Sequence, residues 1–248
     1  MSNSQADRIT AHLATVARLR AQRDADPALG QRVLALKAYQ AARFARSYAD
    51  LLAHPRCGAA ARFFLDDLYG PQEFSRRDAQ FERVVPALVR LFPGELVDTV
   101  AHLGELHALT ETLDDSTASH LPGPPGLACT AAAYAQAWQA AGRASARAQQ
   151  IQLTLDIGAA LDKVTRSRLM RTSLRLMRGP AQAAGLSDLQ RFLESGFDAF
   201  GAMQGAEEFL GLVGARERAL AAALFAPGAP QAAALPAQER PAALAALP

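Results

Sequence analysis

The sequence is poor in aromatic side chains, and this shortage limits how its core can be built. Aromatic residues make up 6% of the 248 residues, while half of the chain is hydrophobic. A core must therefore consist mainly of Ala, Leu and Val. Ala and Leu are strong helix formers, whereas β-branched and aromatic residues favour strands. The composition consequently favours an α-helical protein.

The sequence also has few cysteines, no long apolar run and little net charge. Cys57 and Cys129 lie far apart and form no CxxC pair, which favours free thiols over a disulfide. No run approaches the roughly 18 apolar residues that cross a bilayer, and the polar N-terminal residues do not resemble a secretory signal. We therefore expect a cytoplasmic protein without a transmembrane segment. The formal net charge of +2 requires no nucleic-acid partner.

Apolar residues recur at spacings of three and four, which is typical of amphipathic helices. Asp26-Pro27 predicts a helix start. Gly70-Pro71, Pro93-Gly94 and Gly179-Pro180 predict helix ends. We therefore predict an all-α fold, a single bundle of about 8–10 helices with a kink at Pro86 and no sheet. The expected helices span residues 5–23, 27–53, 59–69, 75–92, 95–115, 130–141, 145–165, 166–178 and 187–225.

The domain boundaries follow from composition. We predict one helical domain over residues 1–226, with halves 1–116 and 128–226 joined by a loop that contains Pro122 to Gly126. Residues 227–248 are rich in Ala and Pro, so we expect them to be a disordered tail that cannot offset its ordering entropy. We also expect buried rings at Phe64, Phe81 and Phe197.

The region from Phe192 to Phe209 combines an apolar stripe with several glycines, which weaken helices. Three explanations stay open: close approach of another helix, a break between Gly201 and Gly205, or a groove for a flat apolar ligand. An aromatic stripe of this kind most often belongs to the core.

Two segments resemble a proteobacterial family of about this length. They read Phe63-Phe64-Leu65-Asp66-Asp67-Leu68-Tyr69-Gly70-Pro71 and Phe74-Ser75-Arg76-Arg77-Asp78-Ala79-Gln80-Phe81. The family carries a domain-of-unknown-function label. The resemblance implies a helical bacterial protein and brings no activity, cofactor or catalytic residue.

A polar cluster on the helix expected over residues 95–115 is a candidate metal site. His107 and Glu111 are one helical turn apart and point toward the apolar side, where Asp114 also falls. Asp67 flanks the apolar face of another helix. Together Asp67, His107 and Glu111 could bind a divalent metal or transfer protons. The alternative is a core histidine that hydrogen-bonds to Glu111 or Asp67.

A second candidate is an arginine stripe. Arg168, Arg171, Arg175 and Arg178 fall within about 80° on one helical face. Guanidinium groups suit phosphate and carboxylate recognition. The alternative is a solvated face paired with neighbouring carboxylates in a chain that has only two lysines, Lys37 and Lys163. No aromatic residues interleave with the arginines, which disfavours single-stranded nucleic acid.

The usual enzyme motifs are absent: there is no phosphate-binding loop, dinucleotide fingerprint, HExxH or GxSxG. No motif indicates a cofactor. We therefore interpret the protein as a binding or regulatory module whose arginine face meets an anionic partner, which could be a protein, a nucleic acid or a membrane surface. A metal- or cofactor-dependent helical-bundle enzyme using Asp67, His107 and Glu111 is the alternative. Self-association into a homo-oligomer stays open.

Overall fold

The computed structural model describes residues 2–68, 79–85 and 94–248, and the description below is confined to them. These residues form twelve named α-helices and no strand, which confirms the all-α prediction. Several of these helices are only one or two turns long, so they exceed the expected number. The helices are α1 (Ser2–Ala25), α2 (Pro27–Ser47), α3 (Ala49–Ala53), α4 (Gly58–Phe63), α6 (Gly94–Ala118), α7 (Ala131–Ala141), α8 (Ala144–Thr165), α9 (Arg168–Leu176), α10 (Arg178–Ala183), α11 (Ser187–Met203), α12 (Glu207–Phe225) and α13 (Ala229–Ala234).

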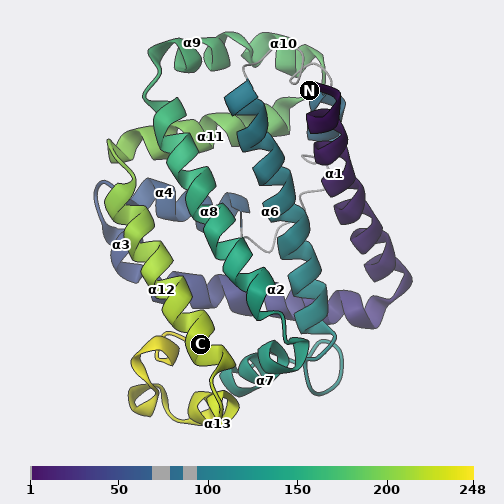
Figure 1. The fold of residues 1–248 in the computed structure, drawn as a ribbon, viewed down its shortest axis with the longest axis vertical. Coiled ribbons are helices and arrows are strands. Elements are labelled where there is room, and N and C mark those ends of the chain that lie inside the picture. Colours follow the sequence, from purple (N-terminus) through teal and green to yellow (C-terminus); the bar gives the residue numbers. More distant parts are fainter. Residues whose placement is uncertain (1, 69–78, 86–93) are drawn as a thin grey trace.

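Four long helices run roughly along the longest axis of the molecule (Figure 1). They lie in the order α1, α6, α8 and α12, and each packs against the next. Helices α2 and α11 cross them, with α2 packed on α6 and α11 packed on α8. Helices α9 and α10 lie across one end, and α7 and α13 lie at the other. This arrangement leaves α9 at the outer edge of the molecule.

Local sequence chemistry sets several helix ends. The Asp26 side chain accepts hydrogen bonds from the backbone of Ala28 and Leu29, and Pro27 is the first helical residue. This confirms the predicted start of α2, because an Asp cap satisfies amide groups that have no partner inside the helix. Helix α7 ends at Gly142, which adopts the left-handed conformation that glycine tolerates best.

The glycine-rich region contains both a break and a close approach. Helix α11 ends at Met203, and Gln204 and Gly205 both adopt positive φ before α12 begins. At Gly196, an added Cβ would lie 2.8 Å from Cζ of Phe63. The chain therefore breaks between Gly201 and Gly205, as one of the three explanations states, and at Gly196 the last residue of α4 approaches the α11 backbone closely.

The prediction that Gly179-Pro180 ends the arginine-rich helix is wrong. Helix α9 already ends at Leu176, and α10 continues from Arg178 through Gly179 and Pro180 to Ala183. Pro180 is the third residue of α10, where its missing N–H is no loss because the first amides of a helix have no internal partner. The predicted kink at Pro86 lies outside the described residues.

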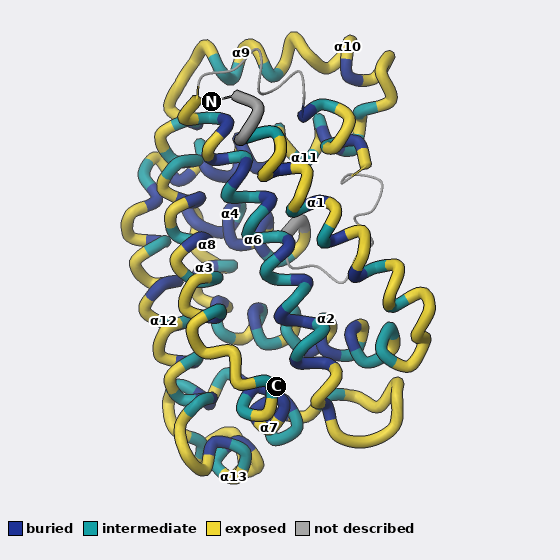
Figure 2. The backbone as a smooth tube through the Cα atoms, turned by 45° about the vertical axis from the view of Figure 1, so that its right-hand side comes forward, coloured by how far each residue is buried: buried dark blue, intermediate teal, exposed yellow. Residues whose placement is uncertain are grey.

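Two large apolar clusters form most of the core, and buried residues line the inner sides of the helices (Figure 2). One cluster is centred on α7, α12 and the C-terminal residues, and includes Tyr134 and Leu224. The other joins α2, α4, α11 and α12, and Phe64 packs there against Phe200 and Phe209. Phe64 and Phe197 are buried as predicted, and Phe81 is partly buried.

The prediction of a disordered tail is wrong. Residues after Ala226 form α13 and short 3₁₀ turns, and Leu244 and Leu247 are fully buried against α2 and α12 residues of the first cluster. Arg240 donates a hydrogen bond of 2.7 Å to the Leu247 carbonyl. Ala229 and Ala233 are buried as well. The low content of large side chains was misleading, because buried alanine loses almost no side-chain entropy.

Candidate functional site

Helix α9 is an amphipathic helix that is attached to the molecule along one side only. The Ser167 hydroxyl caps its start by accepting from the Met170 amide. Its partly buried residues are Met170, Arg171 and Leu174, and none of its residues is fully buried. On a helical wheel, Leu169 and Leu176 point away from that attached side. The outer side of α9 therefore displays large apolar groups.

The four predicted arginines divide into two pairs with different surroundings. Arg171 lies 3.6 Å from Asp198 and over the Phe197 ring, and Arg178 donates a 2.6 Å hydrogen bond to Glu194. Both carboxylates belong to α11, so this pair fastens α9 and α10 to the bundle. The guanidinium groups of Arg168 and Arg175 are exposed, and within the described chain they hydrogen-bond to no other residue.

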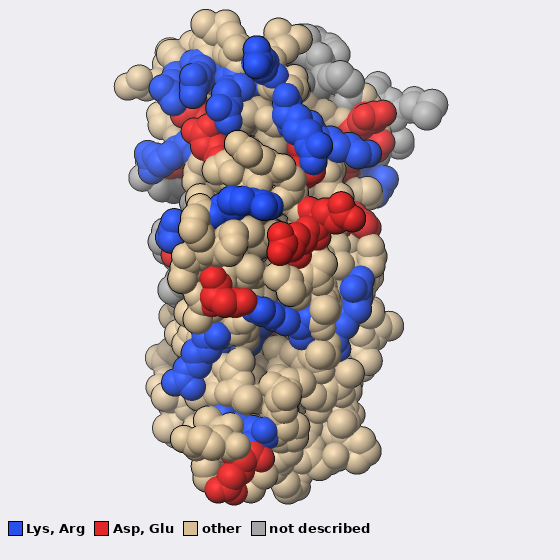
Figure 3. Space-filling model, turned by 90° about the vertical axis from the view of Figure 1, so that its left-hand side faces the viewer, with Lys and Arg blue, Asp and Glu red and all other residues tan. Residues whose placement is uncertain are grey.

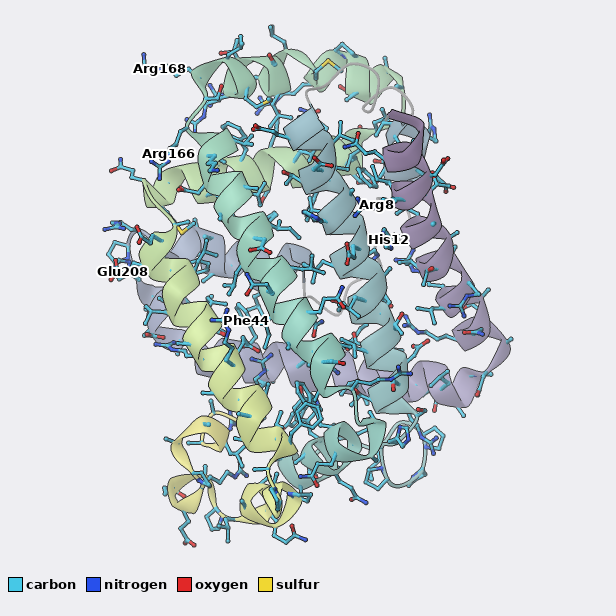
Figure 4. The ribbon with its side chains drawn as sticks, in the orientation of Figure 1. Arg8, His12, Phe44, Arg166, Arg168 and Glu208 are labelled. Atoms are coloured by element: carbon cyan, nitrogen blue, oxygen red, sulfur yellow. The ribbon has the colours of Figure 1, made fainter. Side chains whose placement is uncertain are left out.

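The exposed pair of arginines lies beside unusually exposed leucines. Leu169 is 77% exposed and Leu176 is 73% exposed, and Met177 is exposed next to them. Lys and Arg side chains crowd this end of the molecule, whereas the opposite end is mostly uncharged (Figure 3). Arg166 and Arg168 point outward at the corner where α8 leads into α9 (Figure 4). The term α9 face is used below for Arg168, Leu169, Arg175, Leu176 and Met177.

Glu111, one of the predicted metal ligands, belongs to a buried ion-pair network. Its two carboxylate oxygens accept from Lys37 Nζ at 2.6 Å and from Arg23, which also binds Asp115 at 2.6 Å. Burial alone would raise the pKa of Glu111, but Lys37 and Arg23 lower it to about 2. Two cations in direct contact with this carboxylate disfavour a metal ion at the same place.

The other two predicted ligands lie differently. His107 is partly buried on the same helix, close enough to contribute to the low pKa of Glu111. The Asp67 side chain lies outside the described residues. Among the described residues, no group of three His, Cys, Asp or Glu side chains is arranged to hold a metal ion.

A cavity of about 70 Å³, largely apolar but lined by several polar groups, lies inside the helix bundle. Five helices line it: α2, α6, α7, α8 and α12. It occupies the boundary between the two apolar clusters, with Tyr134 and Trp138 on one side and Phe44, Tyr48 and Phe64 on the other. Phe44 is seen within the ring of helices in Figure 4.

Four charged side chains line this cavity. Arg43 hydrogen-bonds to Glu217, which also accepts from the Tyr48 hydroxyl at 2.6 Å. Asp114 accepts from Gln40 at 3.1 Å, and burial raises its pKa. Arg147 donates to Thr117 at 2.8 Å and lies 4.3 Å from the centre of the Trp138 ring. The cavity therefore contains two guanidinium groups and two carboxyl groups.

Sequence reasoning placed Asp114 on an apolar helical side but missed the cavity. A signal was present, because polar residues occupy core spacings on two of the lining helices. Gln40 and Arg43 lie four and seven residues after the buried Leu36, and Glu217 lies between the buried Val213 and Leu220. Charged residues at such positions are rare unless they are paired.

Comparison with known protein families gives one match. A family model described as Domain of unknown function (DUF8198) matches residues 19–231. The chain belongs to this family, in line with the resemblance found in the sequence. No curated protein and no solved structure matches it. None of the described helices is long and apolar enough to span a membrane.

Proposed function

We propose that this protein is a peripheral binding module that docks on an anionic lipid surface through the α9 face. The observation that carries the proposal is the exposure of Leu169 and Leu176, at 77% and 73%, beside the exposed guanidinium groups of Arg168 and Arg175. Large apolar side chains grouped on a helix that is otherwise attached to a stable bundle mark an interaction surface.

The shape of this end of the molecule favours a flat partner. Helix α9 lies across the end of the long axis, so its outer side can approach a plane without obstruction from the described helices. An interfacial helix places its apolar side among the acyl chains and its basic side chains at the headgroups. The α9 face has this arrangement, with leucines outermost and arginines beside them.

The expected strength is moderate. Burying each leucine contributes about 1.5–3 kcal/mol, and each arginine near an anionic surface contributes about 1 kcal/mol. The sum of about 5–8 kcal/mol supports reversible association once the entropy of binding is subtracted.

Nucleic acid would use the arginines but leave the leucines exposed, so it explains less of the surface. Cys57 and Cys129 are free thiols, which agrees with the prediction of a cytoplasmic protein. We therefore propose that the α9 face binds the inner leaflet of the cell membrane.

Vesicle flotation tests this proposal. The protein is mixed either with neutral phosphatidylcholine vesicles or with vesicles that also contain about 30% anionic phosphatidylglycerol. Each mixture is tested at low and at high salt. We expect flotation with the anionic vesicles, weakened by salt. The double variants Leu169→Ser/Leu176→Ser and Arg168→Gln/Arg175→Gln should each reduce it at least about tenfold, because a tenfold change corresponds to only about 1.4 kcal/mol.

Matched controls are available elsewhere on the surface. Leu34 is an exposed leucine of α2, and Arg18 is an exposed arginine of α1, so Leu34→Ser and Arg18→Gln should leave flotation unchanged. If both double variants float with anionic vesicles as well as the wild type does, the proposal is contradicted. Salt-sensitive binding to duplex DNA without binding to vesicles would instead identify a nucleic-acid surface.

A further inference from the structure

The buried polar cavity calls for an explanation that the α9 face does not supply. A helical bundle is stabilised by close apolar packing, and both empty space and buried charge reduce its stability. Here five helices contribute polar side chains to one cavity of about 70 Å³. Convergent polar groups in a largely apolar pocket are the usual form of a small-molecule site.

The charges around the cavity indicate what kind of molecule fits. Arg43 and Arg147 are balanced by Glu217 and Asp114, so a ligand with a net charge would leave one buried charge unpaired. Arg147 is already occupied by Thr117 and the Trp138 ring. Among the described residues, Arg43 finds a hydrogen-bond partner for Nη1 and none for Nε. Arg43 is therefore the guanidinium with donors to spare.

Asp114 supplies the opposite charge nearby. Gln40 donates to Oδ1 of Asp114, and no other described residue hydrogen-bonds to this carboxyl group. Gln40 and Arg43 are three residues apart on α2, so their side chains project about 5–6 Å apart at the Cβ atoms. Burial raises the pKa of Asp114, and a ligand ammonium group beside it would stabilise the carboxylate.

We propose that this cavity binds a small amino acid as the zwitterion, with its carboxylate on Arg43 and its ammonium group on Asp114. Such a ligand adds no net charge and pairs both open groups at once. A volume of about 70 Å³ holds only a few water molecules, which limits the ligand to glycine, alanine or a molecule of similar size. Glu217, which lines the cavity, is itself partly exposed to solvent.

Titration calorimetry and thermal unfolding of the full chain test this assignment with four probes. They are L-alanine, acetate, ethylamine and acetamide, which carry both charges, either charge alone, or neither. We expect L-alanine to bind at least about tenfold more tightly than the other three. At one hundred times its Kd it should raise Tm by about 5–10 °C.

Variants test the assigned contacts. Asp114→Asn keeps the shape and the acceptor for Gln40 but loses the charge, so the affinity for L-alanine should fall at least about tenfold. Asp156→Asn, on the exposed side of α8, is the matched control and should bind like the wild type. Circular dichroism verifies that Asp114→Asn folds.

Several results would overturn the assignment. If acetate or acetamide bound as tightly as L-alanine, the cavity would not recognise the carboxylate and the ammonium group of the ligand together. Unchanged affinity in Asp114→Asn would remove the proposed ammonium contact. Absence of heat with all four probes would leave the cavity as a structural feature. The comparison of probes on the wild type does not depend on any variant, and vesicle binding through the α9 face is independent of all these outcomes.

Discussion

Replacing Glu111 with Gln should destabilise the protein strongly and in a pH-dependent way. Glu111 is buried and binds both Arg23 and Lys37, which are themselves largely buried. Glutamine cannot neutralise these two cations, so the variant removes the carboxylate that binds Lys37 and leaves Arg23 with Asp115 alone. Breaking a buried ion pair on one side typically costs about 3–5 kcal/mol.

The pKa gives a second estimate of the same effect. The pKa of Glu111 falls from 4.5 to about 2 on folding, because Lys37 and Arg23 outweigh the opposing effect of burial. A difference of about 2.5 pKa units corresponds to about 3 kcal/mol. Since the folded pKa is depressed, this stability is present above pH 4.5 and is lost as the pH falls toward 2. About 1.4 kcal/mol should be gone by about pH 3.5.

Urea denaturation followed by circular dichroism at several pH values measures both quantities. The difference in unfolding free energy between the wild type and Glu111→Gln should be about 3 kcal/mol at neutral pH and should narrow below about pH 4.5. Glu105→Gln on the same helix is the control, because the more exposed Arg8–Glu105 pair at 3.8 Å should contribute below about 1 kcal/mol. A difference that stays constant from pH 7 to pH 3.5 would refute this reasoning.

Two further substitutions test the core. Phe64→Ala removes a buried ring that packs on Phe200 and Phe209, and should lower the unfolding free energy by about 3–5 kcal/mol in urea denaturation; a loss below about 1 kcal/mol would contradict the described packing. Leu244→Ala should cost about 2–5 kcal/mol by the same measurement, because this leucine is fully buried. No change in the second variant would mean that residues after Ala226 do not pack on the bundle in solution.

Much of the fold was predictable, because helices depend on local patterns. The cap at Asp26 and the first position at Pro27 are read directly from the sequence and appear as predicted. The Gly179-Pro180 pair shows the limit of such reading. A proline can follow the end of one helix or lie in the first turn of another. Because α9 already ends at Leu176, Pro180 lies in the first turn of α10.

The tail was misjudged because burial depends on the surface that receives a segment. Leu244 and Leu247 are three positions apart and flanked by alanine and proline, a pattern that resembles disordered sequences. Their burial requires the apolar surface that α2 and α12 supply, and those residues lie about twenty positions earlier or at the other end of the chain. Composition alone contains no information about such a surface.

The candidate sites differ in predictability for the same reason. A helical wheel treats Arg168, Arg171, Arg175 and Arg178 as one stripe, because it considers a single helix. Carboxylates on α11 engage Arg171 and Arg178 and leave Arg168 and Arg175 beside the exposed leucines. The docking surface that we propose is thus the part of the stripe that makes no hydrogen bond to the neighbouring helix. The cavity goes one step further, since Arg43, Asp114 and Glu217 meet only after three helices have packed together. Each sequence segment shows one charged residue at a core spacing, and only the assembled bundle brings these residues together with Arg147 around one cavity.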